Sequence, residues 1–296
     1  MKRRWPRLIP ALLAVAVFVV VAVLAVATRI FDNASERQAR TMFAAAADAP
    51  AGVLTMVDLE GLPAPVQHWI IASGAVGKER ARQVRLLQRG QMRTGLDAPW
   101  AEVQAKQYFT IQPPGFVWTV NTSMKGLPVA GRDHYLDGHG HMLITVGSLV
   151  KVVNAKDAAI DQGAMLRYLG EIIWFPSAAV EPYIRWEAID ADSARATMTW
   201  GDYTVTGVFR FDREGRNVGM TAQRYYYRPE GSTLEQWEVT SDEWKTIRGI
   251  RMPTRGDAHW KLKEGDLSYY RWEILDVEPN RPELYVPGEG PPFSGS

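Results

Sequence analysis

The sequence predicts a mainly β (α+β) protein: a curved antiparallel sheet or open half-barrel with one central helix, preceded by a single N-terminal transmembrane helix. Three observations predict this fold. An uncharged apolar run occupies residues 8–27, apolar and polar residues alternate with period two over much of 82–278, and one segment near 161–175 has helical periodicity. Period two is the pattern of strands that turn one face toward a core.

The apolar run at residues 8–27 is long enough to span a membrane, because twenty helical residues cover about 30 Å. Four cationic residues precede it: Lys2, Arg3, Arg4 and Arg7. The positive-inside rule then places residues 1–7 in the cytoplasm and the remainder of the chain outside, on a single-pass anchor in the inner (cytoplasmic) membrane. The small residues of Ala25-Val26-Ala27 keep a cleaved signal peptide open as the alternative.

The remainder of the chain divides into a juxtamembrane stalk, a β-rich domain that is periplasmic or extracellular, and a disordered tail rich in Pro, Gly and Ser, at residues 28–60, 61–279 and 280–296. A short helix is predicted over 65–73, with Pro65 in its first turn. Asp161 is the predicted N-cap of the central helix, which Pro176 terminates after about Trp174. We expect this helix to pack against the concave face of the sheet.

Composition excludes several functional classes. The chain has no cysteine, which excludes disulfides and thiolate metal sites. Apart from the four N-terminal cations, 30 basic residues face 33 acidic ones, and this balance argues against a nucleic-acid partner. The sequence contains no P-loop, dinucleotide fingerprint, nucleophile elbow or His-Glu-x-x-His motif, so no cofactor is expected and no catalytic residue is identified.

Several short motifs carry a resemblance to a known family. They are Leu62-Pro63-x-Pro65, Gln107-Tyr108-Phe109, Pro113-Pro114-Gly115-Phe116-Val117-Trp118, Gly131-Arg132-Asp133, Asp161-Gln162-Gly163, Leu166-Arg167-Tyr168-Leu169, Trp174-Phe175-Pro176, Ser193-Ala194-Arg195-Ala196-Thr197 and Pro253-Thr254-Arg255-Gly256. Over about residues 60–278 the chain resembles an uncharacterised bacterial family of membrane-associated proteins, a domain of unknown function. The strand–helix–strand order also resembles the half-barrels of the lipoprotein carriers (LolA/LolB-like), which implies architecture only.

Aromatic residues and a polar cluster around the central helix indicate a ligand cavity. A curved sheet with a helix across it can leave an apolar space with a polar mouth. We expect its ligand-binding residues to be Trp118, Arg132, Asp133, Arg167, Tyr168, Trp174, Phe175, Tyr225 and Trp260. Arg85, Arg89 and Arg93 share one face of a strand and are candidates for lipid-headgroup contact, the alternative being a solvated face.

Two constellations could carry chemistry. Asp137, His139 and His141 are candidate metal ligands if 137–143 is a strand, and two glycines between them favour a turn instead. The carboxylates of Asp161 and Glu171 are candidates for general acid–base work.

Three hypotheses on function follow. The first is a membrane-tethered extracytoplasmic binding or carrier module for a lipid or other apolar ligand. The alternatives are a metal-dependent or carboxylate hydrolase, and a structural subunit that docks an envelope protein partner.

Overall fold

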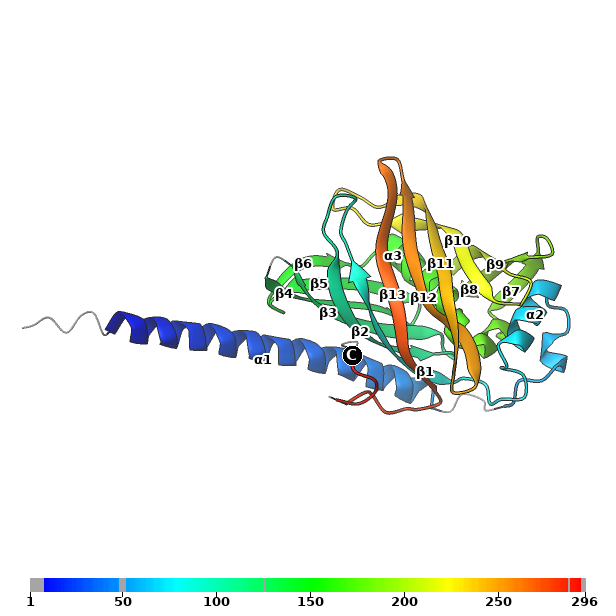
Figure 1. Cartoon of the computed structure of the whole chain (residues 1–296), viewed down its shortest axis with the longest axis horizontal. Coiled ribbons are helices and arrows are strands. Elements are labelled where there is room, and N and C mark those ends of the chain that lie inside the picture. Colours follow the sequence, from blue (N-terminus) through cyan, green and yellow to red (C-terminus); the bar gives the residue numbers. More distant parts are fainter. Residues whose placement is uncertain (1–7, 48–51, 125, 287, 294–296) are drawn as a thin grey trace, which may run out of the picture.

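One antiparallel sheet organises the protein. The computed structural model describes residues 8–47, 52–124, 126–286 and 288–293, and within them thirteen strands pair in the order β6-β5-β4-β3-β2-β1-β13-β12-β11-β10-β9-β8-β7. The sheet curves around helix α3 (Figure 1). The predicted mainly β fold with a central helix and a long apolar N-terminal helix is therefore confirmed.

The strands are β1 Gln83–Met92, β2 Ala101–Thr110, β3 Gly115–Met124, β4 Leu127–Leu136, β5 His139–Val146, β6 Val150–Ala155, β7 Ile184–Ala188, β8 Ser193–Trp200, β9 Tyr203–Phe211, β10 Asn217–Tyr226, β11 Thr233–Ile247, β12 Ile250–Leu262 and β13 Gly265–Pro279. The α-helices are α1 Leu8–Ala45, α2 Ala64–Ala72 and α3 Ala158–Glu171. Short 3-10 turns occupy η2 Val57–Leu59, η3 Ile172–Trp174 and η4 Pro176–Val180.

The sheet consists of two meanders, β1–β6 and β7–β13, joined along β1 and β13. Their junction pairs Val84 with Pro279 and Met92 with Tyr270, and it shifts register at Leu87/Gln88. The segment between the meanders carries α3 and then η3 and η4 across the concave face. The edge strands are β6 and β7.

The main core lies between α3, the following turns and the concave face of the sheet. Leu166, Leu169 and Ile172 are fully buried, and Phe175 packs on Phe109 with ring centroids 4.9 Å apart. Burial of each large apolar side chain contributes about 1.5–3 kcal/mol. This packing fixes α3 across the sheet, so the side chains on its cavity-facing side have fixed positions.

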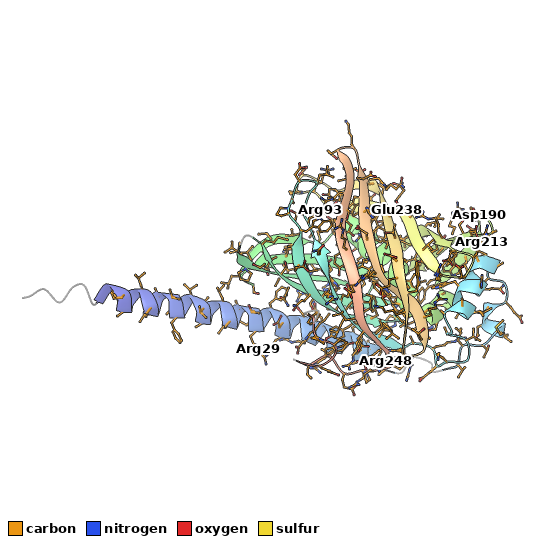
Figure 2. All side chains as sticks on the ribbon, in the orientation of Figure 1. Arg29, Arg93, Asp190, Arg213, Glu238 and Arg248 are labelled. Atoms are coloured by element: carbon orange, nitrogen blue, oxygen red, sulfur yellow. The ribbon has the colours of Figure 1, made fainter. Side chains whose placement is uncertain are left out.

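The predicted anchor and the first part of the predicted stalk form one helix of 38 residues, α1. Its apolar part has a mean hydropathy of 3.0 over a window that is only 6% buried, and it is long enough to cross a membrane. This part projects from the domain (Figures 1 and 2), whereas Met42 and Phe43 near the helix end are buried against the sheet. The cationic residues 1–7, predicted to be cytoplasmic, lie outside the described residues.

The structure corrects the predicted N-cap of the central helix, and it also describes the segments at 137–143 and 280–296. The central helix begins at Ala158, and its N-cap is Asp157, whose side chain accepts a hydrogen bond from the Ile160 amide; Asp161 lies in the first turn. Asp137 forms a turn between β4 and β5 and has a φ of 53°, so 137–143 is not a continuous strand. The segment expected to be a disordered tail contains Leu284 and Tyr285, which are 4% and 2% exposed.

Candidate functional site

A cavity of about 410 Å³ lies between the concave sheet face and α3. Small-molecule sites commonly measure roughly 300–1,000 Å³, so the space suits a small ligand or part of a larger one. Its walls are mainly apolar and aromatic, and of the expected ligand-binding aromatics they include Trp118, Trp174, Tyr225 and Trp260. Aromatic residues of the sheet and of the segment after α3 therefore contribute both to the core and to the lining of this cavity.

A half-buried ion triad forms the polar part of the cavity wall. Nη1 of Arg167 lies 3.1 Å from Oδ2 of Asp133, and its Nε lies 2.8 Å from Oε1 of Glu171. The guanidinium also lies 4.6 Å from the ring centre of Trp118. Burial raises the pKa of both carboxyl groups, and the neighbouring Arg167 opposes that rise.

A chain of side-chain hydrogen bonds connects this triad to strands β13, β1 and β2. The Tyr270 hydroxyl donates to Oε1 of Gln88, and the Gln88 amide donates to Oε1 of Gln107. The Gln107 amide then donates to Oε2 of Glu171 at 2.7 Å. Both oxygens of Glu171 thus accept hydrogen bonds, which fixes the carboxyl group in place.

The remaining expected ligand-binding residues lie outside the cavity. Tyr168 and Phe175 are packed in the core, and the Tyr168 hydroxyl donates to the carbonyl oxygen of Thr110. Arg132 points to the opposite face of β4 from Asp133, because successive side chains of a strand alternate between faces. There it lines a second groove, of about 710 Å³, between α1 and strands β4–β6.

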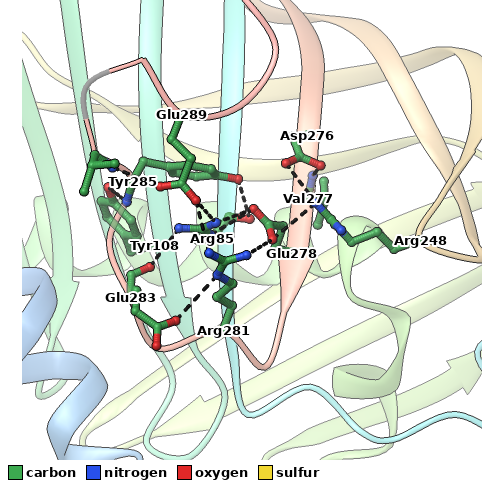
Figure 3. A network of polar contacts seen from close by, with 11 residues as sticks. Arg85, Tyr108, Arg248, Asp276, Val277, Glu278, Arg281, Glu283, Tyr285 and Glu289 are labelled. Carbon is green, nitrogen blue, oxygen red and sulfur yellow. Dashed lines mark hydrogen bonds and ion pairs between the residues drawn. The ribbon is translucent and has the colours of Figure 1, made fainter.

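The three arginines at positions 85, 89 and 93, the last of which directly follows β1, have different environments. Arg85 is fully buried and pairs with Glu278 and Glu289 (Figure 3). Arg89 pairs with Glu273 at 2.9 Å, and Arg93 lines the cavity while donating to the carbonyl oxygens of Ser268 and Leu96. Arg85 and Arg89 are thus paired with carboxylates of β13 and the C-terminal segment.

The candidate metal ligands do not converge. Nδ1 of His139 lies 3.3 Å from Oδ2 of Asp161, whereas Nε2 of His141 contacts Oδ1 of Asn154 at 2.9 Å. Within the described part of the chain, no group of three or more His, Cys, Asp or Glu residues is placed to hold a metal ion.

The candidate acid–base pair is also separated. Asp161 and Glu171 stand ten residues apart on one helix, which is about 15 Å along its axis. Two carboxyl groups that share a hydrolytic reaction usually lie roughly 5–9.5 Å apart. This spacing is too wide for the pair to act on one bond.

Sequence reasoning missed one charged residue of the cavity. Arg224 lines it, donates to the carbonyl oxygen of Gly163 and lies 4.8 Å from the ring centre of Trp237. Residues 220, 222, 224 and 226 alternate with outward-facing residues along β10. This alternation could have predicted that Arg224 points to the concave face of the sheet.

The curved sheet, the helix across it and the cavity between them define an α+β half-barrel domain carried on a long apolar helix. The chain belongs to the family of unknown function DUF6544, whose model matches residues 52–272. No curated protein matches the chain.

The similarity of the chain to solved structures is low. A DUF1329 family protein from Desulfovibrio piger is 9% identical over 73% of this chain and 92% of its own, with a TM-score of 0.42. A putative outer membrane lipoprotein-sorting protein domain from Vibrio parahaemolyticus is 9% identical over 67% and 85%, with a TM-score of 0.39. A LolA superfamily protein from Nitrosomonas europaea is 13% identical over 73% and 94%, with a TM-score of 0.36.

Proposed function

We propose that this protein is a membrane-tethered binding or carrier module that holds a lipid or another apolar ligand in the cavity between the concave sheet and α3. The observation that carries the proposal is the cavity itself, an internal space of about 410 Å³ with mainly apolar walls. A domain of this size usually fills such a space with side chains, because close packing stabilises the core. An open apolar space is therefore a site for an apolar guest.

The polar part of the cavity wall suits a ligand with a polar end. Arg167, Asp133 and Glu171 stand at one part of the lining, and aliphatic and aromatic side chains form most of the rest. An amphipathic molecule could place its apolar chain among the rings and its polar group beside the triad. In this proposal α1 spans the inner membrane once, with residues 1–7 inside and the half-barrel in the periplasm or outside the cell.

A variant that fills the cavity tests the proposal. Ala159 lines the cavity, whereas the adjacent Ala158 is exposed and does not line it, so Ala159→Phe and Ala158→Phe form a matched pair. Binding of a neutral apolar fluorescent probe, N-phenyl-1-naphthylamine, is measured on full-length protein in detergent. We expect Ala159→Phe to weaken probe binding by roughly fivefold or more through lost volume, and Ala158→Phe to bind like the original protein. Failure of the original protein to bind the probe, or equal binding by both variants, would overturn the proposal.

A further inference from the structure

The second groove lies beside α1 at the C-terminal end of its apolar run. Its walls are α1 from Ala22 to Ala34 on one side and the outer face of β4–β6 on the other. The turn between β5 and β6 touches the helix: Oγ of Ser148 lies 3.4 Å from Oγ1 of Thr28. A Cβ at Gly147 would approach Leu24 to 2.7 Å, so glycine permits this close contact.

Arg132 is a buried cation without a counter-ion in the lining of this groove. The residue is 8% exposed, and its Nε is buried with no hydrogen-bond partner among the described residues. Its Nη1 reaches Oγ of Ser35 only at 3.5 Å, and its guanidinium lies 5.6 Å from the ring centre of Phe31. No carboxylate in the described ranges forms an ion pair with it. A buried, unpaired charge is unfavourable, and a bound anion would offset that penalty.

The rim of the groove combines apolar side chains with a second cation. Leu149, in the turn before β6, is 53% exposed, and Lys151 of β6 also lines the groove. An exposed aliphatic side chain is unfavourable in water and favourable against lipid. Leu149 lines the groove together with Ala22, Val23 and Val26 of α1, so its apolar surface adjoins that of the helix.

The depth of Arg132 matches the phosphate layer of a bilayer. Its neighbours Phe31 and Ser35 follow the last apolar-run residue, Ala27, by four and eight residues, which is about 6–12 Å of helix. The headgroup zone adds roughly 5–8 Å to each side of the hydrocarbon core. A lipid beside α1 could therefore place its phosphate at Arg132 and its acyl chain along the apolar run.

We propose that the groove between α1 and β4–β6 binds an anionic phospholipid of the membrane that α1 spans. Arg132 and Lys151 hold the phosphate, and the acyl chain lies against Ala22–Ile30 of α1 and Leu149. The site rests on the anchoring part of the proposed function and is separate from the central cavity.

Lipid retention by full-length protein tests the site. Protein extracted in detergent is mixed with phosphatidylglycerol or phosphatidylcholine, and bound lipid is counted by native mass spectrometry. We expect retention of phosphatidylglycerol over phosphatidylcholine, lost by roughly tenfold or more in Arg132→Gln and about fivefold in Lys151→Gln. Arg195→Gln is the matched control, because Arg195 is an exposed arginine of β8 outside the groove. Equal retention in Arg132→Gln and Arg195→Gln would overturn the proposal, as would displacement of the lipid by inorganic phosphate alone.

A second measurement does not depend on Arg132. The chain has no cysteine, so Leu149→Cys and Val57→Cys each give one labelling site, both at exposed aliphatic residues, and Leu149 lines the groove. In nanodiscs, lipids brominated on their acyl chains should quench a fluorophore at position 149 and leave position 57 unquenched; equal signals would refute membrane contact. Probe binding in the central cavity should be unchanged in Arg132→Gln, so failure of this site and failure of the cavity ligand are distinguishable.

Discussion

Arg167 holds two carboxylates inside a cavity with mainly apolar walls. Both acids are drawn toward their neutral forms by burial, and the guanidinium opposes this shift. Removal of one partner from a buried ion network is strongly unfavourable because charge remains without compensation. The triad therefore supports the fold as well as the polar part of the proposed site.

We predict that Arg167→Leu lowers the free energy of unfolding by about 3–5 kcal/mol at neutral pH. The loss should be smaller at pH 5 than at pH 8. Without the guanidinium, the folded-state pKa values of Asp133 and Glu171 rise further above their unfolded values, so the folded state binds more protons than the unfolded one. Stability is then retained at low pH and lost as pH rises through the folded-state values.

Urea unfolding at the two pH values measures this difference. The control is Arg195→Leu, because Arg195 pairs with Glu187 at an exposed site and should contribute less than about 1 kcal/mol. An equal loss of stability at pH 5 and pH 8 for Arg167→Leu would contradict the assigned direction of the carboxyl pKa shifts.

Arg132 and Asp133 show how far the location of a side chain can be predicted from sequence. Both residues were expected at one ligand site, and alternation along a strand sends them to opposite faces. The pattern predicts that they separate, but it does not reveal that α1 covers the outer face. Only the packing of α1 on the sheet creates the groove that Arg132 lines.

At the scale of elements, local periodicity predicted the helices and most strands, and it failed where partners are distant in sequence. Arg85 and Arg89 share one face of β1, and Arg93 follows the strand. Their carboxylate partners Glu273 and Glu278 come from β13, almost two hundred residues away, and no local pattern announces that pairing. The shifted start of α3 has a simpler cause, since Asp157 and Asp161 are both suitable caps and lie one turn apart.

The helix α1 should be retained in the mature protein. Its apolar run satisfies its own backbone groups in lipid, and its last part is packed on the sheet through Met42 and Phe43. We expect full-length protein to resist carbonate extraction and to have an intact mass that includes residues 8–27. N-terminal sequencing decides the matter: a mature chain that begins at Thr28 would mean cleavage after Ala27 and loss of one wall of the groove.

At the scale of the whole molecule, the two proposed sites should be separable. The cavity lies between the sheet and α3, whereas the groove needs α1 residues that precede the domain. We predict that a chain of residues 29–296 is water-soluble, binds the neutral probe within about twofold of the full-length affinity, and does not retain phosphatidylglycerol. Loss of probe binding in a folded 29–296 chain would contradict this separation of sites.

The position of β1 beside β13 has a consequence for how the chain acquires its fold. Each meander, β1–β6 and β7–β13, can assemble by successive hairpins between sequence neighbours. The seam between β1 and β13 instead requires two segments at opposite ends of the domain to meet, and such non-local pairing is slow. We therefore expect the two meanders to form early and the pairing of β1 with β13 to form last. The segment between β6 and β7, which contains α3, connects the two meanders throughout.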